Sequence, residues 1–280
     1  MTLTRRPRLL AFDIDSTLVT PAGELKQEII DGLRACHRAG MHVAYLTNRA
    51  PRLAAEVTDS VGVPALTSTA SGCLSWEYPG WHCIDVRALT AEQVALGLDA
   101  LRPCSVNCYV YAPEEGVELV HLERRPASCA DKFLARYYPK QHRRVSEPTE
   151  LQSYEVYKLA VVGAPEEITP LREALPAQVT DCLYSYVHQM RLIDTPALEL
   201  TDPRATKGEA LKMFAQRLGI AQQEVVAVGD SENDIPMLSW AGHGVSMPVA
   251  GPKVRAAADQ QLEGDDPAAL AGFLQRLLMD

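Results

Sequence analysis

Short apolar runs alternate with helical patterns in the first 70 residues. The apolar run 9–12 predicts a strand buried on both faces, 42–46 predicts a second buried strand, and 65–67 predicts a third, short strand. Apolar side chains at helical spacing predict two helices between these strands. The first is ended by Gly40 and has one apolar face, formed by Leu25, Ile29, Leu33 and Cys36. The second begins near Ala50, with Leu53 and Val57 facing inward. This alternation predicts a parallel sheet with crossover helices.

The pattern changes between residues 83 and 196. Helices are predicted over 92–101, 131–138 and 166–174, and strands over 106–111, 117–122, 157–162, 182–187 and 190–193, with a hairpin turn at 113–116. Hairpins mixed with helices are typical of an α+β unit. We therefore expect a core of residues 1–82 and 197–280, and an inserted unit of residues 83–196.

The strand–helix alternation resumes at Leu198. Helices are predicted over 208–218, 235–240, 253–258 and 267–279, and strands over 225–228 and 243–247. The predicted fold class is α/β, a Rossmann-like doubly wound parallel sheet with an inserted α+β domain.

The composition of the chain excludes several classes of function. The chain has 280 residues, 47% of them hydrophobic, which is enough for two domains, and its net charge of −9 argues against non-specific nucleic-acid binding. The apolar run near the N-terminus is short and interrupted by Asp13, which argues against a signal peptide, and no run approaches the ~20 apolar residues of a membrane span. Seven scattered cysteines predict reduced thiols in a cytoplasmic protein. Cys104 and Cys108 have no second Cys or His pair nearby to complete a zinc site.

Polar residues follow the predicted strands where each one ends. Asp13, Thr47 and Ser68 fall at carboxyl ends of strands, where ligands bind in such sheets. Asp13 and Asp15 are two residues apart, so in extended geometry their side chains would leave the same side of the backbone. Paired carboxylates suit a divalent cation and phosphoryl chemistry.

Each candidate also has an ordinary structural explanation. Acids that close a strand often face water, Thr47 can be a strand-ending polar residue, and Lys207 can be a solvated lysine at a helix start. Asp230 and Asp234 can be an N-cap and a first-turn acid that the helix dipole favours.

Four separated signals, taken in order, resemble the haloacid dehalogenase superfamily, in its Cof-type, sugar-phosphatase-like branch with an α/β cap of the C2B type. The stretch 13–18 (DIDSTL) is similar to the first family motif and Thr47 to the second. Lys207 within 206–211 (TKGEAL) is similar to the third motif, and 229–238 (GDSENDIPML) to the fourth. The resemblance covers nearly the whole chain and is weak only in the cap.

The resemblance implies a Mg²⁺-dependent phosphatase of small phosphorylated metabolites, sugar phosphates first, acting through an aspartyl-phosphate. Asp13 would be the nucleophile, ionised at pH 7 at the ordinary pKa of an aspartate. Asp15 would protonate the leaving oxygen and then activate the water. Lys207 and Thr47 would stabilise the phosphoryl oxygens.

The same resemblance implies the metal and substrate ligands. Mg²⁺ would be held by the Asp13 carboxylate, the backbone carbonyl of Asp15 and Asp230, while Asp234 would hold a metal-bound water or orient Lys207. The phosphate- and substrate-binding residues would be Thr17, Thr47, Asn48, Arg49, Lys207 and Asn233.

Some residues depart from the family pattern. Ser16 and Asn48 stand where glycine is usual, Ser71 replaces an asparagine, and the loop 247–250 lacks the usual asparagine. In the family the cap supplies specificity, and the candidates here are Arg124, Arg125, Tyr184, His188 and Arg191; solvated charges on a small sheet are an equal explanation.

Alternatives from other classes stay open. A phosphomutase would pass the phosphoryl group to a sugar hydroxyl, and a silent relative would bind ligands without catalysis. Phosphonate hydrolysis and haloacid hydrolysis are both disfavoured, since haloacid hydrolysis needs no metal and would not preserve the acidic cluster. The expected partner is a small phosphorylated metabolite, with no nucleic acid or membrane, and the expected assembly is a monomer or a homodimer.

Overall fold

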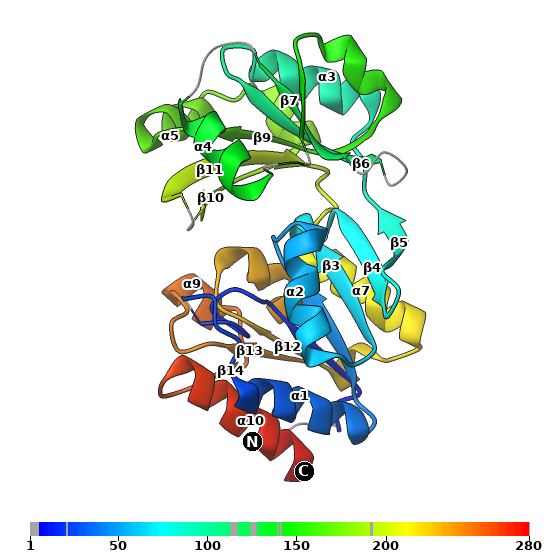
Figure 1. The fold of residues 1–280 in the computed structure, drawn as a ribbon. Coiled ribbons are helices and arrows are strands. Elements are labelled where there is room, and N and C mark those ends of the chain that lie inside the picture. The colour runs from blue at the N-terminus through cyan, green and yellow to red at the C-terminus, as the bar shows by residue number, and fades with distance from the viewer. Residues whose placement is uncertain are drawn as a thin grey trace. The chain divides into compact units, whose positions relative to one another are not determined.

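The computed structural model describes residues 6–20, 22–112, 117–123, 128–138, 140, 142–190 and 193–279. The chain divides into two compact units, Met1–Asp85 with Arg204–Asp280, and Val86–Pro203. Figure 1 shows that the first unit is built from both ends of the chain. The second unit is therefore an insertion into the first.

A single sheet runs through the first unit, in the strand order β14-β13-β12-β1-β2-β3-β4-β5 over the described residues. Its strands are β1 (Leu9–Phe12), β2 (His42–Leu46), β3 (Ala65–Thr69), β4 (Leu74–Tyr78), β5 (His82–Val86), β12 (Val225–Gly229), β13 (His243–Ser246) and β14 (Gln260–Gln261). β1 pairs in parallel register with both β2 and β12. The carboxyl ends of these three strands therefore meet at one edge of the sheet.

Helices cover both faces of this sheet: α1 (Gln27–Arg38), α2 (Pro51–Val61), α7 (Lys207–Leu218), α8 (Ile235–Trp240), α9 (Pro252–Ala256) and α10 (Asp266–Met279). Leu10 and Phe12 of β1 lie in one buried cluster with side chains of α1, α2 and α10. Leu9 and Ala11, which alternate with them, lie in a second cluster with side chains of α7, α8 and α9. This arrangement confirms the predicted doubly wound α/β fold.

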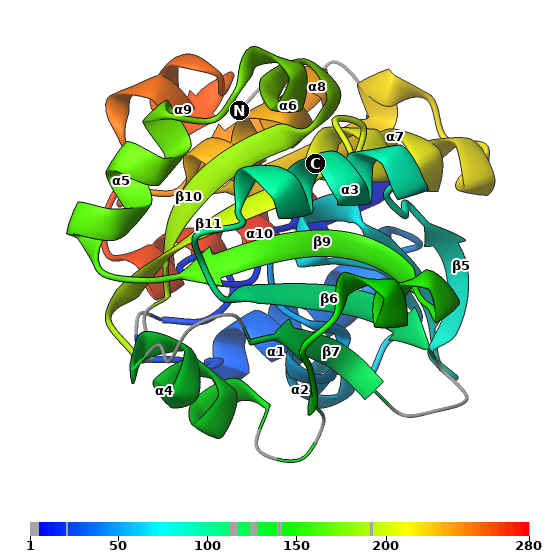
Figure 2. The same ribbon diagram turned by 90° about the horizontal axis from the view of Figure 1, so that it is seen from above.

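The second unit contains a separate sheet in the order β10-β11-β9-β6-β7-β8, again over the described residues. Its elements are β6 (Val106–Ala112), β7 (Val117–Leu122), β8 (His142–Val145), β9 (Glu155–Val162), β10 (Tyr184–Met190) and β11 (Thr195–Thr201), with α3 (Ala91–Ala100), α4 (Ser128–Tyr137), α5 (Pro165–Glu173) and α6 (Ala177–Cys182). Leu98, Ile168 and Val179 of α3, α5 and α6 pack into one core with this sheet. Figure 2 shows these three helices over the sheet. Within the described chain, no helix is both long and apolar enough to cross a membrane.

The boundaries predicted from the sequence differ from the observed boundaries at both junctions between the two units. Leu198 was expected to resume the core, but it lies in β11, which pairs with β9 and β10 of the second sheet. Strands were expected at 182–187 and 190–193, but the second of them is observed at Thr195–Thr201. An apolar run reveals a strand but not the sheet it joins, so the second unit extends to Pro203.

Several elements were not predicted. β4 and β5 add to the first sheet beyond β3, with β4 antiparallel to it, and this moves the first junction from residue 82 to Asp85. β8 was not predicted, because its residues Arg143 and Arg144 are exposed on an edge strand and give no apolar pattern. The predicted turn 113–116 lies outside the described residues.

Candidate active site

Asp13 is the first residue after β1. Its backbone N–H donates to the carbonyl of Val228 (3.0 Å), which continues the pairing with β12, and its side chain is buried. The chain then turns, since the N–H of Leu18 donates to the carbonyl of Ile14 (2.9 Å) and Ser16 has a φ of +61°. The extended geometry expected from Asp13 to Asp15 is therefore wrong, because β1 ends at Phe12. Ser16 thus has a left-handed backbone conformation, which glycine adopts most easily, and this explains why glycine is usual at this position in the family.

Lys207 lies at the start of α7, directly after the capping residue Thr206, whose hydroxyl accepts from the N–H of Glu209 (3.1 Å). The Lys207 ammonium donates to Oδ1 of Asp13 (2.6 Å) and to Oδ1 of Asp234 (2.5 Å). Its side chain is 1% exposed, so the solvated-lysine explanation is wrong. Burial alone would lower the pKa of Lys207, but the two carboxylates raise it overall, and the ammonium is charged.

Asp234 is held by the loop that follows β12. Its Oδ2 accepts the backbone N–H groups of Asp230 and Ser231, each at 2.9 Å. A Cβ on Gly229 would lie 2.6 Å from the Cβ of Asp234, so only glycine permits this close approach. The loop therefore fixes one carboxylate oxygen and turns the other toward Lys207.

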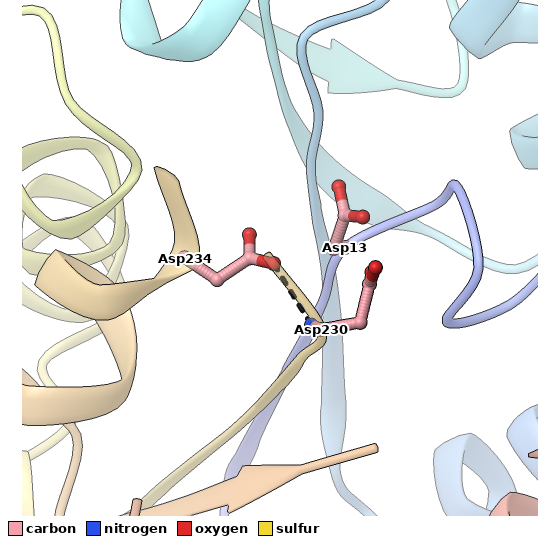
Figure 3. Close-up of side chains that lie close together, drawn as sticks. All are labelled: Asp13, Asp230 and Asp234. Atoms are coloured by element: carbon pink, nitrogen blue, oxygen red, sulfur yellow. Dashed lines mark hydrogen bonds between the residues drawn. The ribbon is translucent and has the colours of Figure 1, made fainter. Parts of the chain in front are cut away.

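Three carboxylates converge beside Lys207. Asp13, Asp230 and Asp234 each offer an oxygen, and these oxygens lie within 4.8 Å of one another. Figure 3 shows the three side chains close together, and its dashed line marks the hydrogen bond from the Asp230 N–H to the Asp234 carboxylate. Thr17 donates its hydroxyl hydrogen to Oδ1 of Asp230 (3.2 Å). An all-oxygen set of carboxylates from two adjacent strand ends fits a hard divalent cation such as Mg²⁺.

The electrostatics of Asp13 are set by its neighbours. Burial raises the pKa of Asp13, Lys207 lowers it, and the carboxylates of Asp234, Asp230 and Asp15 raise it further, with the net shift upward. The ordinary pKa expected from the sequence is therefore wrong for this buried site. Among the described residues, Oδ2 of Asp13 accepts no hydrogen bond.

The loop after β2 carries Thr47, which is fully buried. Its N–H donates to the carbonyl of Ser68 (2.9 Å), and its hydroxyl oxygen accepts the N–H of Arg49 (3.1 Å). The N–H of Ser71 donates to the Thr47 carbonyl (3.0 Å), and the Ser71 hydroxyl donates to Oδ1 of Asn48 (2.8 Å). Asn48 and Ser71, two departures from the family pattern, thus contact each other.

Arg49 and Asp15 form a bidentate ion pair. Nε donates to Oδ2 and Nη2 to Oδ1, each at 2.9 Å. Burial lowers the pKa of Arg49, but the hydrogen bonds and charge of Asp15 raise it overall. The Asp15 side chain therefore faces Arg49 and is not part of the Asp13–Asp230–Asp234 group.

The remaining expected site residues have different positions. Asn233 accepts the Ser231 hydroxyl through Oδ1 (2.7 Å), so its side chain braces the loop after β12. Tyr184 and His188 lie on β10 of the second unit. Arg124, Arg125 and Arg191 lie outside the described residues.

Sequence reasoning missed two supporting residues. Ser231 donates to Asp234 from both its backbone and its hydroxyl. Gly72 has a φ of +106°, and a Cβ there would lie 2.6 Å from the carbonyl oxygen of Thr206. A glycine that ends a polar loop after a strand is the signal that could have identified this close packing.

Comparison with known proteins agrees with this fold. Residues 10–274 match the sequence profile of the haloacid dehalogenase-like hydrolases. The chain is 26% identical to phosphatase YwpJ of Bacillus subtilis, over 97% of this chain and 100% of that protein. It is 27% identical to the HMP-PP phosphatase of Serratia proteamaculans, over 97% and 95%. A crystal structure of a haloacid dehalogenase-like hydrolase from Bacteroides thetaiotaomicron superimposes with a TM-score of 0.78 at 20% identity, over 97% of this chain and 99% of that one.

This chain belongs to the haloacid dehalogenase-like hydrolases, because the family profile spans nearly all of it. The family expected from the four motifs is confirmed.

Proposed function

We propose that this protein is a Mg²⁺-dependent phosphatase that hydrolyses small phosphorylated metabolites, with sugar phosphates as the first substrate class. The observation that carries the proposal is the contact between Lys207 and Asp13 inside a group of three buried or half-buried carboxylates. A nucleophile, a fixed positive charge and a set of metal ligands are thereby combined at one edge of the sheet.

The reaction has two steps. In the first, a carboxylate oxygen of Asp13 forms a bond to phosphorus while the bond from phosphorus to the ester oxygen breaks. Asp15 acts here in its protonated form, in which one of its oxygens is released from Arg49, and it gives that proton to the departing oxygen. In the second, a water forms a bond to the same phosphorus, Asp15 takes its proton, and the aspartyl-phosphate bond breaks to release inorganic phosphate. Oδ2 of Asp13 is suited to the attack, since Lys207 occupies Oδ1.

The neighbouring residues stabilise charge on the phosphoryl oxygens. Lys207 supplies a buried ammonium, and Thr47 and backbone N–H groups of the 14–17 turn supply hydrogen-bond donors. Thr17, Asn48, Arg49 and Asn233 complete the proposed substrate-binding set. Mg²⁺ would be held by the carboxylates of Asp13 and Asp230 and by the Asp15 backbone carbonyl, with Asp234 orienting Lys207 or holding a metal-bound water. It would offset the negative charge of this group and of the substrate phosphate.

The two curated relatives support this proposal, because both are named phosphatases and both align over nearly the whole chain. We further propose that the inserted second unit supplies substrate specificity, as the resemblance implies.

The test is release of inorganic phosphate from a panel of phosphorylated sugars, nucleotides and cofactors, with Mg²⁺ and with EDTA. The proposal predicts release that requires Mg²⁺ and that falls at least ~10³-fold in Asp13→Asn, whose amide cannot form the phosphoenzyme. Isomerisation of a sugar phosphate without release would favour a mutase. Full activity in EDTA or in Asp13→Asn would contradict the mechanism.

A further inference from the structure

The loop that follows β13, residues 247–250, lies beside the strand end that carries Asp230. The N–H of Met247 donates to the carbonyl of Gly229 (3.0 Å), so the two neighbouring strand ends stay paired beyond β13. Gly229 in turn packs tightly on Asp234, because a Cβ at Gly229 would lie 2.6 Å from the Cβ of that residue. A shift of the loop would therefore move Gly229 and the two carboxylates that follow it.

The two ends of this loop are anchored by buried side chains, and its middle is not. Met247 is fully buried in the cluster that includes α1 and α10, and Ala250 is 1% exposed in the cluster that includes α7 and α8. Val249 between them is 55% exposed, and its side chain has no hydrogen-bonding group. Pro248 has no backbone N–H to donate. The middle of the loop therefore supplies no side-chain hydrogen bond that would fix it.

Arg255 of α9 holds this part of the loop instead. Its Nε donates to the carbonyl of Ala250 (2.7 Å), and its Nη2 donates to the carbonyl of Pro248 (3.0 Å). The helix itself is anchored by Val254, which is 2% exposed and lies in the same cluster as Ala250. One planar guanidinium thus ties two carbonyls of the loop to a helix that is fixed to the core.

We propose that Arg255 is a positioning residue for the divalent cation: by holding the loop 247–250, it keeps the carboxylate of Asp230 where a cation can bind it together with Asp13. The inference rests on the proposed Mg²⁺ site and adds to it a residue that is not itself a ligand. Mg²⁺ demands near-ideal octahedral geometry, so a small displacement of one carboxylate lowers its affinity.

The charge of Arg255 would have the opposite effect on metal binding. A positive side chain repels a cation, so removal of that charge alone would strengthen Mg²⁺ binding. Lys253 of the same helix shows the effect of charge, because its ammonium forms an exposed ion pair with Glu232 of the loop after β12 (3.0 Å). Weaker Mg²⁺ binding after loss of Arg255 would therefore report positioning and not charge.

The test measures the Kd of Mg²⁺ by titration calorimetry, without substrate, for the wild-type protein and for Arg255→Met. We expect about fivefold weaker binding in Arg255→Met, because two hydrogen bonds that hold the loop are lost. Arg255→Lys keeps the charge but cannot reproduce the planar pair of donors, so it should weaken binding by about threefold. Lys253→Met should bind Mg²⁺ at least as tightly as the wild-type protein.

Arg34→Met is the matched control for a purely structural role. Arg34 of α1 also uses Nε and Nη2 to hold two carbonyls, those of Val61 (2.8 Å) and Ser60 (3.2 Å), at the end of α2. This end of α2 precedes β3, so it lies at the edge of the sheet opposite to the carboxyl ends of the strands. Arg34→Met should lower Tm about as much as Arg255→Met does and should leave the Kd of Mg²⁺ unchanged.

Three results would overturn the inference. The first is an unchanged Kd in folded Arg255→Met, and the second is equal weakening in Arg255→Met and Arg34→Met. The third is tighter Mg²⁺ binding in Arg255→Met, which would show that the residue acts through its charge. If Arg255→Met does not fold, the Kd of Arg255→Lys decides the same question.

The inference and the proposed function can fail separately. A wild-type protein that binds no Mg²⁺ contradicts both of them. A wild-type protein that binds Mg²⁺ but releases no phosphate from p-nitrophenyl phosphate contradicts the phosphatase function alone, and the Kd values still decide the role of Arg255. A wild-type protein that binds Mg²⁺ and releases phosphate, together with an unchanged Kd in Arg255→Met, contradicts only the inference.

Discussion

Arg49 binds both carboxylate oxygens of Asp15, through two hydrogen bonds of 2.9 Å. Asp13, two residues earlier, instead contacts Lys207. The two acids of one short motif therefore lie in different environments, one paired with a guanidinium and one grouped with two further carboxylates. This separation accords with the proposed roles of Asp13 as the nucleophile and Asp15 as the proton carrier.

Arg49→Lys should impair proton transfer without impairing the first attack. Lysine cannot hold both oxygens of Asp15, so the carboxyl group loses its fixed orientation. With p-nitrophenyl phosphate, whose leaving group needs little protonation, we expect a normal burst of p-nitrophenol and a steady state that is slower by about tenfold or more. Stopped-flow absorbance measures both phases. Loss of the burst would show that the first attack needs Arg49 and would contradict this prediction.

Divalent cations should stabilise the protein through Asp230 but not through the side chain of Asp15. Mg²⁺ binding to the native state raises Tm in proportion to its affinity. We expect Asp230→Asn to abolish this shift, because a ligand of the group is lost. Asp15→Asn should retain it, since that carboxylate contacts Arg49. Thermal melts with Mg²⁺ and with EDTA distinguish the variants, and loss of the shift in Asp15→Asn would contradict the assignment.

Gly72→Ala should reduce kcat by about tenfold or more. Both Gly72 and Gly40 have left-handed φ values, but a Cβ at Gly72 would collide with the backbone of Thr206, whereas nothing lies within 4 Å of one at Gly40. The collision would displace Lys207, and misplaced catalytic groups are costly. Gly40→Ala is the matched control, with a lower Tm from backbone strain and an unchanged kcat. Equal kcat values for the two variants would refute this role of Gly72.

Asn48 and Ser71 should act as a coupled pair. Their hydrogen bond joins the loop of Thr47 to a turn in which Ala70 and Ser71 both have left-handed φ values. The hydrogen bond is half-buried and holds the loop of Thr47 in its reactive position. Its loss, worth about 1 kcal/mol, should therefore lower kcat/KM by roughly fivefold in each of the single variants Asn48→Gly and Ser71→Asn. The double variant Asn48→Gly/Ser71→Asn, which restores the usual family residues, should recover most of this loss. Additive losses in a double-mutant cycle would show that the residues are independent.

The core sheet could be predicted from the sequence because its central strands are apolar runs. The runs at β1, β2 and β12 were predicted within a residue or two, and the polar residues that end them meet at one edge of the sheet. β4 and β8 escaped prediction, since one continues a sheet beyond a loop and the other is a charged edge strand. The sheet to which β11 belongs depends on long-range pairing, which no local pattern encodes.

The site was predictable in its residue types but not in its pairings. Asp13, Lys207 and Asp234 could be named from motifs, whereas the burial of Lys207 between the two acids depends on how α7 meets two loops. The Arg49–Asp15 and Asn48–Ser71 contacts also join separate strand ends. Such contacts follow from the tertiary structure, and spacing along the chain does not reveal them.

The most direct test of the central claim is capture of the phosphorylated nucleophile. Asp15→Asn should slow hydrolysis of the aspartyl-phosphate, so p-nitrophenyl phosphate and Mg²⁺ followed by acid quench should allow the intermediate to accumulate. Mass spectrometry of the digested protein should then find one phosphoryl group on the peptide that contains Asp13, and none when Asp13→Asn is added or when EDTA replaces Mg²⁺. Phosphate release with no phosphorylation of Asp13, or with the phosphoryl group on another residue, would contradict the account.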